Sequence, residues 1–190
     1  MEIGLFFGSF NPIHAGHLII AQAVLQEADL REVWFIVSPQ NPLKKNQSLA
    51  HEFDRYEMVQ LAIADNPHFR VSDIEFRMKR PSYTIDTLVR LSEKYPAHRF
   101  RLIMGMDNLQ IFSKWKNSQE ILNNYGIIIY PRPGSVHSEL TNHTNIQLIE
   151  SPLLDISATY IRKCIRSGKT IKYLVPESVE DYIRVKKLFL

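Results

Sequence analysis

Short apolar segments alternate with stretches of helical periodicity along most of this chain. Segments rich in β-branched and aromatic residues, as in strands, occur at residues 2–7, 32–38, 69–72, 99–104, 126–130 and 146–149. Apolar residues at helical spacing occur between them, at residues 16–28, 54–64, 82–93 and around 109–123. Because strands that alternate with connecting helices form parallel sheets, we predict an α/β fold with a doubly wound parallel sheet.

The pattern changes at Ser157, after which two helices follow one another without a strand between them. Ser157 is a suitable N-cap, and Gly168 a suitable C-terminal stop, for the first of these helices. Pro176 suits the first turn of the second helix, which we expect to run to Lys187. We expect the pair to pack against the C-terminal ends of the strands, where open α/β sheets bind their ligands.

Length and charge narrow the choice of protein class. We expect residues 1–190 to form a single domain, with the sheet in 1–155 and a C-terminal helical segment in 156–190. The formal net charge of +3 does not indicate a nucleic-acid partner. The apolar run at 126–130 is far shorter than the roughly 18 residues that a membrane-spanning helix needs.

Two further features bear on where the protein works. The first residues lack the basic region of a signal peptide, so none is expected. The only cysteine, Cys164, cannot form an intrachain disulfide, which is typical of the reducing cytosol. We therefore expect a cytoplasmic protein that binds neither nucleic acid nor membrane, with a homo-oligomer as an open alternative.

The segment between the first strand and the first helix reads GSFNPIHAGH. We expect Gly8 to adopt a positive φ and to let a ligand approach closely, and Pro12 to stiffen the loop. His14 and His17 fall on one side of an opening helical turn, and Gly16 leaves room for a bulky group. Helix-end N–H groups beside two imidazoles suit a phosphate chain.

This segment could also be another nucleotide-binding motif, a metal site or a surface pair of histidines. It matches neither the P-loop pattern nor the G-x-G-x-x-G dinucleotide fingerprint. His14 and His17 have a spacing that permits two metal ligands, but no Cys, Glu or third His stands nearby to complete a metal site. A bare H-x-x-H is most often a surface pair, and the complete string between a strand and a helix argues against that.

The string resembles the G-x-F-x-P-x-H-x-G-H signature of nucleotidyltransferases related to class I aminoacyl-tRNA synthetases. The segment ISATYIR at 156–162 resembles the second motif of that superfamily. From Ile3 to Ile183 the chain is similar to bacterial nicotinate-nucleotide adenylyltransferases. The similarity includes further segments, in order SYTIDTL (82–88), MGMDNL (104–109), Trp115, RPG (132–134) and LVPESVEDYI (174–183).

The chain departs from the family pattern in two places. The family usually has two glycines and an Asp in its first motif, where this chain has Phe7-Gly8 and Asn11. The segment PQNPLKK, which ends at Lys45, follows a family pattern only loosely. These departures leave the loop geometry and the role of Lys45 open, and they do not alter the reaction class.

The resemblance implies a Rossmann-like fold and transfer of an adenylyl group. The 5′-phosphate of nicotinate mononucleotide would attack the α-phosphorus of ATP, giving nicotinate adenine dinucleotide and pyrophosphate. Two polyanions must meet in line, so such a site needs positioning and cations more than a nucleophilic side chain. Mg²⁺ is expected with ATP, held by phosphates and water, with no metal ligands from protein side chains.

The resemblance also implies roles for particular residues. Catalysis is assigned to His14, His17 and Arg162. The same three are expected to bind ATP together with Gly8, Ser9, Phe10, Gly105, Asp107, Ile156, Ser157 and Thr159. Nicotinate mononucleotide is expected to contact Ser9, Phe10, Asn41, Lys45, Tyr83, Thr84, Trp115 and Arg132.

Several of these residues have structural alternatives. Ser157 and Asp107 are both favoured helix caps, and Trp115 could be a core residue. Arg132 and Lys45 could equally be solvated charges, which is also the default for an isolated Arg162.

The same residues help to distinguish this function from its rivals. The same chemistry could act on phosphopantetheine, glycerol phosphate or nicotinamide mononucleotide, and SYTIDTL with Trp115 argues against the first two. A non-catalytic nucleotide sensor or an RNA-binding module would be expected to lack His17 or Arg162, and both are present. An RNA binder should also carry a basic stripe, whereas the charges here are interspersed.

Overall fold

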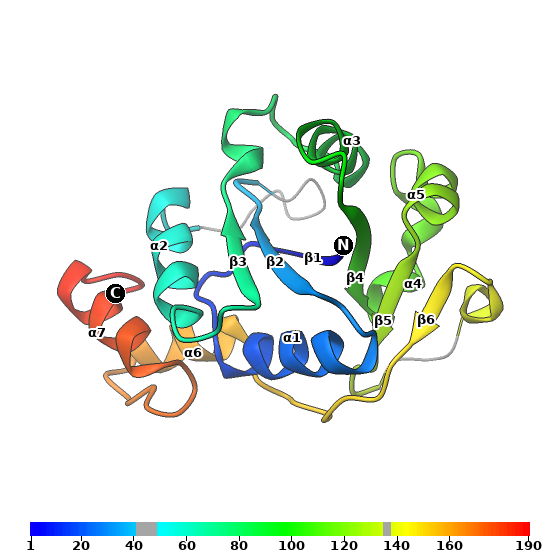
Figure 1. Ribbon diagram of the computed structural model, residues 1–190. Helices are drawn as coiled ribbons and strands as arrows, with labels where there is room; N and C mark the ends of the chain where they lie inside the picture. The colour runs from blue at the N-terminus through cyan, green and yellow to red at the C-terminus, as the bar shows by residue number, and fades with distance from the viewer. Residues whose placement is uncertain (41–48, 135–137) are drawn as a thin grey trace.

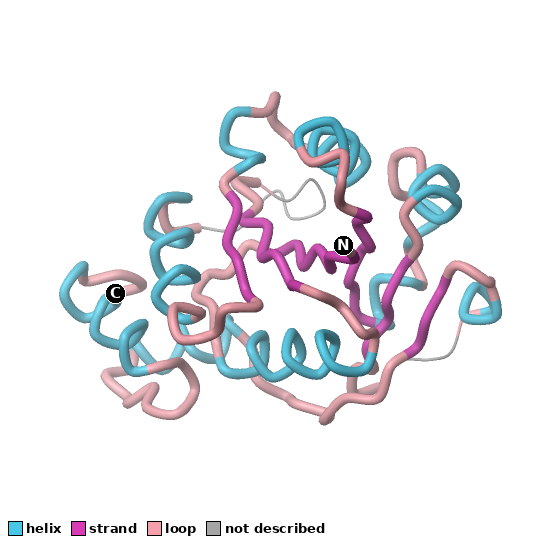
Figure 2. The backbone as a smooth tube through the Cα atoms, in the orientation of Figure 1, coloured by secondary structure: helices cyan, strands magenta, loops and turns pink. Residues whose placement is uncertain are grey.

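The computed structural model describes residues 1–40, 49–134 and 138–190. Six strands form one sheet in the order β3-β2-β1-β4-β5-β6, and every pairing is parallel (Figures 1 and 2). The strands are β1 (Glu2–Gly8), β2 (Glu32–Val37), β3 (Phe69–Ser72), β4 (Arg99–Gly105), β5 (Ile127–Tyr130) and β6 (Ile146–Leu148). The predicted doubly wound parallel sheet is confirmed, and its strand order reverses between β1 and β4.

The helices follow the predicted segments except around residues 109–123. They are α1 (Ala15–Glu27), α2 (Glu52–Ala62), α3 (Thr84–Lys94), α4 (Met106–Leu109), α5 (Ser118–Asn124), α6 (Ala158–Arg166) and α7 (Glu177–Lys186). The helical material expected around 109–123 is broken, because Asn117 has a left-handed φ of 51° that no α-helix accommodates. A 3₁₀ turn, Phe112–Lys114, stands between α4 and α5. No described helix is long and apolar enough to cross a membrane.

Alternate residues of each strand supply two separate cores, one on each face of the sheet. In β2, Val33, Phe35 and Val37 join a cluster with α1, α2, α6 and α7, while Trp34 and Ile36 join the other cluster, with α3, α4 and α5 (Figure 1). Both faces are therefore apolar, as the continuous hydrophobic strands require.

The two C-terminal helices do not share one position. Ser157 caps α6, with its hydroxyl accepting from the Tyr160 N–H at 3.2 Å, and α6 starts beside the carboxyl ends of the strands. The second helix, α7, packs against α2 instead, and Tyr182 donates to Asp54 Oδ1 at 2.8 Å. The prediction for this helix was wrong, because its apolar stripe, with Val179 and Ile183, is buried in the core cluster that α2 shares. Pro176 stands at the N-cap of α7 and not within its first turn.

Candidate active site

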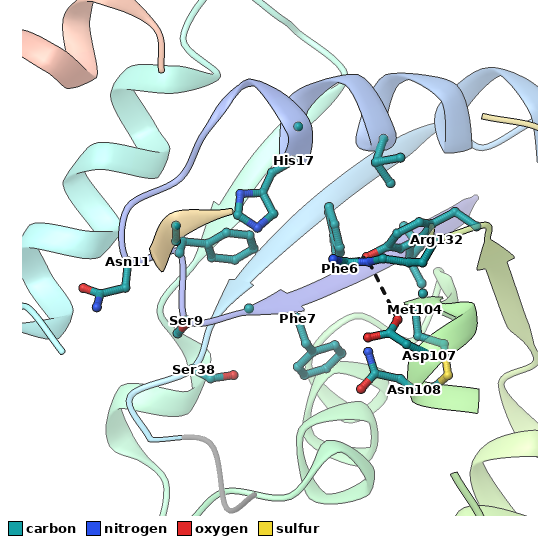
Figure 3. A pocket seen from close by; sticks show the side chains of 18 of the residues that line it. Phe6, Phe7, Ser9, Asn11, His17, Ser38, Met104, Asp107, Asn108 and Arg132 are labelled. Carbon is teal, nitrogen blue, oxygen red and sulfur yellow. Dashed lines mark hydrogen bonds and ion pairs between the residues drawn. The ribbon is translucent and has the colours of Figure 1, made fainter. Parts of the chain in front are cut away.

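A pocket of about 490 Å³ opens at the carboxyl ends of the central strands, where the strand order reverses. That volume lies within the usual range of small-molecule sites, and the position is the one at which open α/β sheets bind ligands. Figure 3 shows residues that β1, β4 and their following loops contribute to its walls. The two ends of this pocket differ in composition.

The pocket brings together every predicted site residue that the structure describes. These residues are Gly8, Ser9, Phe10, His14, His17, Tyr83, Thr84, Gly105, Asp107, Trp115, Arg132, Ile156, Ser157, Thr159 and Arg162. Asn41 and Lys45, also predicted, lie outside the described residues. We call the part formed by His14, His17, Ser157, Thr159 and Arg162 the histidine end, and the part formed by Tyr83, Thr84 and Trp115 the tryptophan end.

Gly8 serves the loop in a different way from the one predicted. It is the last residue of β1 and does not have a positive φ, which belongs instead to Phe10, at 45°. A Cβ on Gly8 would lie 2.7 Å from Cζ of Phe10. The glycine is therefore needed because the Phe10 ring packs over it, and that ring in turn meets the rings of Phe6 and His17.

The two histidines form a stacked pair at the start of α1. His14 is the N-cap, His17 is the third residue of the helix, and their ring centroids are 3.7 Å apart. The His14 backbone N–H donates to Nδ1 of His17 at 3.3 Å. A ring that accepts at Nδ1 carries its proton on Nε2, so His17 presents an N–H donor at Nε2.

Burial keeps His14 neutral. It is only 6% exposed, and burial together with the charge of Arg132 lowers the pKa of His14 to about 4. The space that Gly16 leaves is filled by this ring, since a Cβ on Gly16 would lie 3.1 Å from Nδ1 of His14. At neutral pH His14 therefore offers hydrogen bonds and not positive charge.

Arg162 connects the second sequence motif to the first. Its Nη1 donates to the Asn11 carbonyl at 2.7 Å, across 151 residues of sequence, and its Nη2 donates to Thr159 Oγ1 at 3.2 Å. Asn11 also accepts from the Ala50 N–H through Oδ1, at 3.0 Å. The amide oxygen of Asn11 thus accepts a bond that the carboxylate of an Asp could also accept.

Asp107 and Arg132 form an ion pair in the pocket wall (Figure 3). Arg132 Nε lies 3.7 Å from Asp107 Oδ1, and Nη2 donates to the Tyr130 hydroxyl at 3.1 Å. The N-cap of α4 is Gly105, and no side chain caps that helix, so the capping alternative for Asp107 was wrong. Arg132 is likewise paired, and is not simply a solvated charge.

The tryptophan end is built around the start of α3. Tyr83 is the N-cap of that helix, and Lys116 Nζ lies 4.9 Å from the Tyr83 ring centroid while contacting both Asp86 oxygens at 2.9 Å. Trp115 is half-buried: it packs against Phe112, and it also lines the pocket. Its Nε1 is buried without a hydrogen-bond partner among the described residues. Core packing and a place in the pocket wall are thus both true of this tryptophan.

Sequence reasoning missed a buried carboxylate in the pocket wall. Glu75 is 2% exposed and accepts from Ser82 Oγ at 2.7 Å and from Thr87 Oγ1 at 2.8 Å. Burial raises the pKa of Glu75, and hydrogen bonds from Ser82, Thr87 and Ser38 partly offset that rise. The only signal was indirect, since Ser82 and Thr87 belong to SYTIDTL. Phe7 also lines the pocket and was not predicted to do so.

Comparisons with known proteins show which family the chain belongs to. Residues 5–164 match the Cytidylyltransferase-like family. A protein of Cytophaga hutchinsonii named probable nicotinate-nucleotide adenylyltransferase is 58% identical, over 100% of this chain and 98% of its own length. One of the same name from Flavobacterium psychrophilum is 46% identical, with 96% of each chain covered.

A solved structure supports the fold. The Plasmodium falciparum nicotinic acid mononucleotide adenylyltransferase complexed with NaAD superposes with a TM-score of 0.83, covering 99% of this chain and 97% of that one, at 22% identity. Identity this low shows the fold alone, whereas the two bacterial relatives show descent. The chain therefore belongs to the nicotinate-nucleotide adenylyltransferase family of nucleotidyltransferases.

Proposed function

We propose that this pocket transfers the adenylyl group of ATP to the 5′-phosphate of nicotinate mononucleotide, a step of NAD biosynthesis. A phosphate oxygen of the acceptor forms a bond to the α-phosphorus as the bond to the β-phosphate oxygen breaks. The products are nicotinate adenine dinucleotide and pyrophosphate. ATP lies across the histidine end and the acceptor's ring lies at the tryptophan end.

One observation carries this proposal: the two sequence motifs, at opposite ends of the chain, meet in one pocket. Arg162 joins them directly by its bond to the Asn11 carbonyl. Neither motif alone surrounds a polyphosphate. Together they place imidazole, guanidinium and helix-end N–H groups around one space.

The histidine end suits a triphosphate. His17 presents Nε2–H to the α-phosphate, where a hydrogen bond gains strength as negative charge moves toward the leaving group. Ser157 and Thr159 each accept a bond within the protein, so each retains its own O–H for a β- or γ-phosphate oxygen. Arg162 adds the positive charge that the neutral His14 lacks, and Ile156 and Phe10 line the apolar side.

Mg²⁺ belongs to this proposal as part of the nucleotide substrate. The described residues contain no group of three or more His, Cys, Asp or Glu side chains that could hold a metal ion. The ion would be held by the phosphate oxygens and water, where it would neutralise charge on the departing pyrophosphate.

The tryptophan end suits a flat, electron-poor ring that carries a carboxylate. Trp115 offers an aromatic face to the pyridinium, and Thr84 begins α3, where backbone N–H groups can bind the carboxylate. Lys116 lines the same end and adds a positive charge. Asp107 and Arg132, in the pocket wall, would face the ribose hydroxyls and the acceptor's phosphate, respectively.

Pyrophosphate release tests the function directly. Purified protein is given ATP and Mg²⁺ with either nicotinate mononucleotide or nicotinamide mononucleotide. Fast release with the nicotinate form and slow release with the amide is the expected result. Equal rates would move the acceptor specificity away from the carboxylate, and release with neither acceptor from folded protein would overturn the proposal.

A further inference from the structure

Helix α2 contains an arginine in the middle of its buried stripe. The buried residues of α2 are Arg55, Met58, Val59 and Ala62, at helical spacing. The side chain of Arg55 is only 1% exposed, and it forms no salt bridge with a carboxylate among the residues described. A leucine or methionine would fill this position without the cost of removing a guanidinium from water. The charge must therefore serve something other than packing.

The guanidinium donates to four backbone carbonyls. Nε bonds Ala50 O at 3.0 Å, Nη1 bonds Ser9 O at 2.6 Å and Ser38 O at 2.8 Å, and Nη2 bonds Pro39 O at 3.1 Å. Burial lowers the pKa of Arg55 to about 10, so the group stays charged at neutral pH. One planar fork thus joins three backbone segments: the loop after β1, the end of β2 and the residue pair before α2.

Two of those carbonyls belong to pocket residues. Ser9 and Ser38 both line the pocket and lie near each other at its wall (Figure 3). The third segment extends the connection, because the Ala50 N–H donates to Asn11 Oδ1 and Arg162 donates to Asn11 O. Arg55 and Arg162 therefore hold the Ser9–Asn11 turn from two sides, on either side of Phe10 with its positive φ.

We propose that Arg55 is a positioning residue for adenylyl transfer, which fixes the loop after β1 so that Arg162 and His17 meet the same triphosphate. Arg55 would not touch substrate. Its effect passes through the carbonyls of Ser9 and Ser38, whose positions set the shape of the loop. This inference rests on the proposed function for its kinetic consequence, but its structural consequence can be measured without turnover.

The first test separates positioning from stability. Arg55→Lys keeps the charge and loses the planar fork, so it cannot reach four carbonyls in that geometry. At a temperature well below the Tm of the variant, where it is folded, we expect kcat to fall about 100-fold. A misplacement of catalytic groups by about 1 Å can cause a loss of this size. A lower Tm with unchanged kcat would show a merely structural arginine and overturn the proposal.

A matched control comes from another partly buried arginine. Arg101 in β4 donates to Gln147 Oε1 at 2.8 Å and does not line the pocket. Arg101→Lys should lower stability and leave kcat within about twofold of wild type. If both lysine variants lost kcat equally, loss of any such arginine would explain the result and the proposal would fail.

Chemical rescue of an alanine variant tests the same role if the lysine variant is too unstable for its kcat to be compared with wild type. Arg55→Ala leaves a cavity that a guanidinium ion fits, and millimolar guanidinium should restore kcat with saturation. Urea has a similar planar shape without the charge and should restore much less. Equal rescue by the two compounds, or rescue by neither in folded protein, counts against the assigned role.

Hydrogen exchange makes the result independent of catalysis. In the absence of nucleotide, amides in residues 9–14 should exchange at least tenfold faster in Arg55→Lys than in wild type, and not in Arg101→Lys. Unchanged exchange there would overturn the inference even if activity fell. If wild type shows this protection but no pyrophosphate release, the proposed function fails and the role of Arg55 in the loop still stands.

Discussion

The histidine end and the tryptophan end of the pocket are held by different kinds of contact. The histidine end has one local side-chain bond, between Arg162 and Thr159, but charged side chains also tie it to backbone carbonyls of distant segments. Arg55 and Arg162 bind Ser9 and Asn11 in this way. At the tryptophan end, side chains bind one another within about 30 residues of sequence, as Lys116 does with Asp86. Backbone anchors fix geometry, whereas side-chain pairs can exchange partners when a ligand arrives. The first end is therefore suited to the chemical step and the second to the choice of acceptor.

The largest expected effect is at the histidine end. His17→Ala should lower kcat about 1,000-fold while the KM for ATP changes little, because the Nε2–H bond is worth most as charge develops. Steady-state kinetics with each substrate varied in turn gives both constants. A change confined to KM would assign His17 to ground-state binding of ATP. The histidine end would then not be specialised for the chemical step.

The next effect belongs to the tryptophan end. Trp115→Ala should raise the KM for nicotinate mononucleotide about 30-fold, since loss of a stacking aromatic costs about 2 kcal/mol, and leave the KM for ATP nearly unchanged. Trp34→Phe serves as control, because Trp34 is a core aromatic that does not line the pocket. Equal losses for both substrates would indicate that Trp115 mainly supports folding.

A third effect concerns pH and stability. The pKa of His14 is about 4 in the folded protein and near 6.5 when unfolded, so the unfolded state takes up a proton first as the pH falls. The contribution of His14 to the free energy of unfolding is therefore full above pH 6.5 and falls progressively as the pH is lowered to about 4. Between pH 7 and pH 5 the free energy of unfolding should fall by about 2 kcal/mol. Urea unfolding of wild type and His14→Asn at both pH values isolates this loss, which should be absent from the variant. Parallel pH profiles would contradict a buried neutral His14.

The smallest expected effect is at Glu75, where stability depends on pH in the opposite direction from His14. Burial raises the pKa of Glu75, so this carboxyl favours the folded state at low pH, and that contribution is lost as the pH rises through its folded pKa. Relative to wild type, Glu75→Gln should therefore gain stability as the pH rises from 4.5. The KM of this variant for nicotinate mononucleotide should rise about fivefold. That factor corresponds to the loss of one hydrogen bond worth about 1 kcal/mol near Thr84. A rise in the KM for ATP instead would place Glu75 with the histidine end.

Local patterns predicted most of the sheet and much of the pocket. The strand at 69–72 is found with its predicted bounds, and the histidines of the first motif start a helix as expected. Periodicity could not show that Asn117 interrupts the helical material after β4, because one left-handed residue leaves the apolar spacing almost unchanged. Nor could it show that α7 packs beside α2, since an apolar stripe does not specify its partner.

The buried ions were harder to foresee for a physical reason. Arg55 is satisfied by carbonyls and Glu75 by hydroxyls, so neither has an oppositely charged residue that sequence spacing would reveal. Arg55 did leave one sign, because it occupies the first position of the stripe completed by Met58, Val59 and Ala62. A charge within an apolar stripe indicates a cation with a task in the interior.

The bond between Arg162 and Asn11 has a consequence for synthesis of the protein. Residue 11 leaves the ribosome early, and its partner follows only after 150 further residues have been added. A nascent chain can thus form β1, α1 and β2 long before it can bind a triphosphate. The bond that joins the two motifs can therefore form only near the end of synthesis.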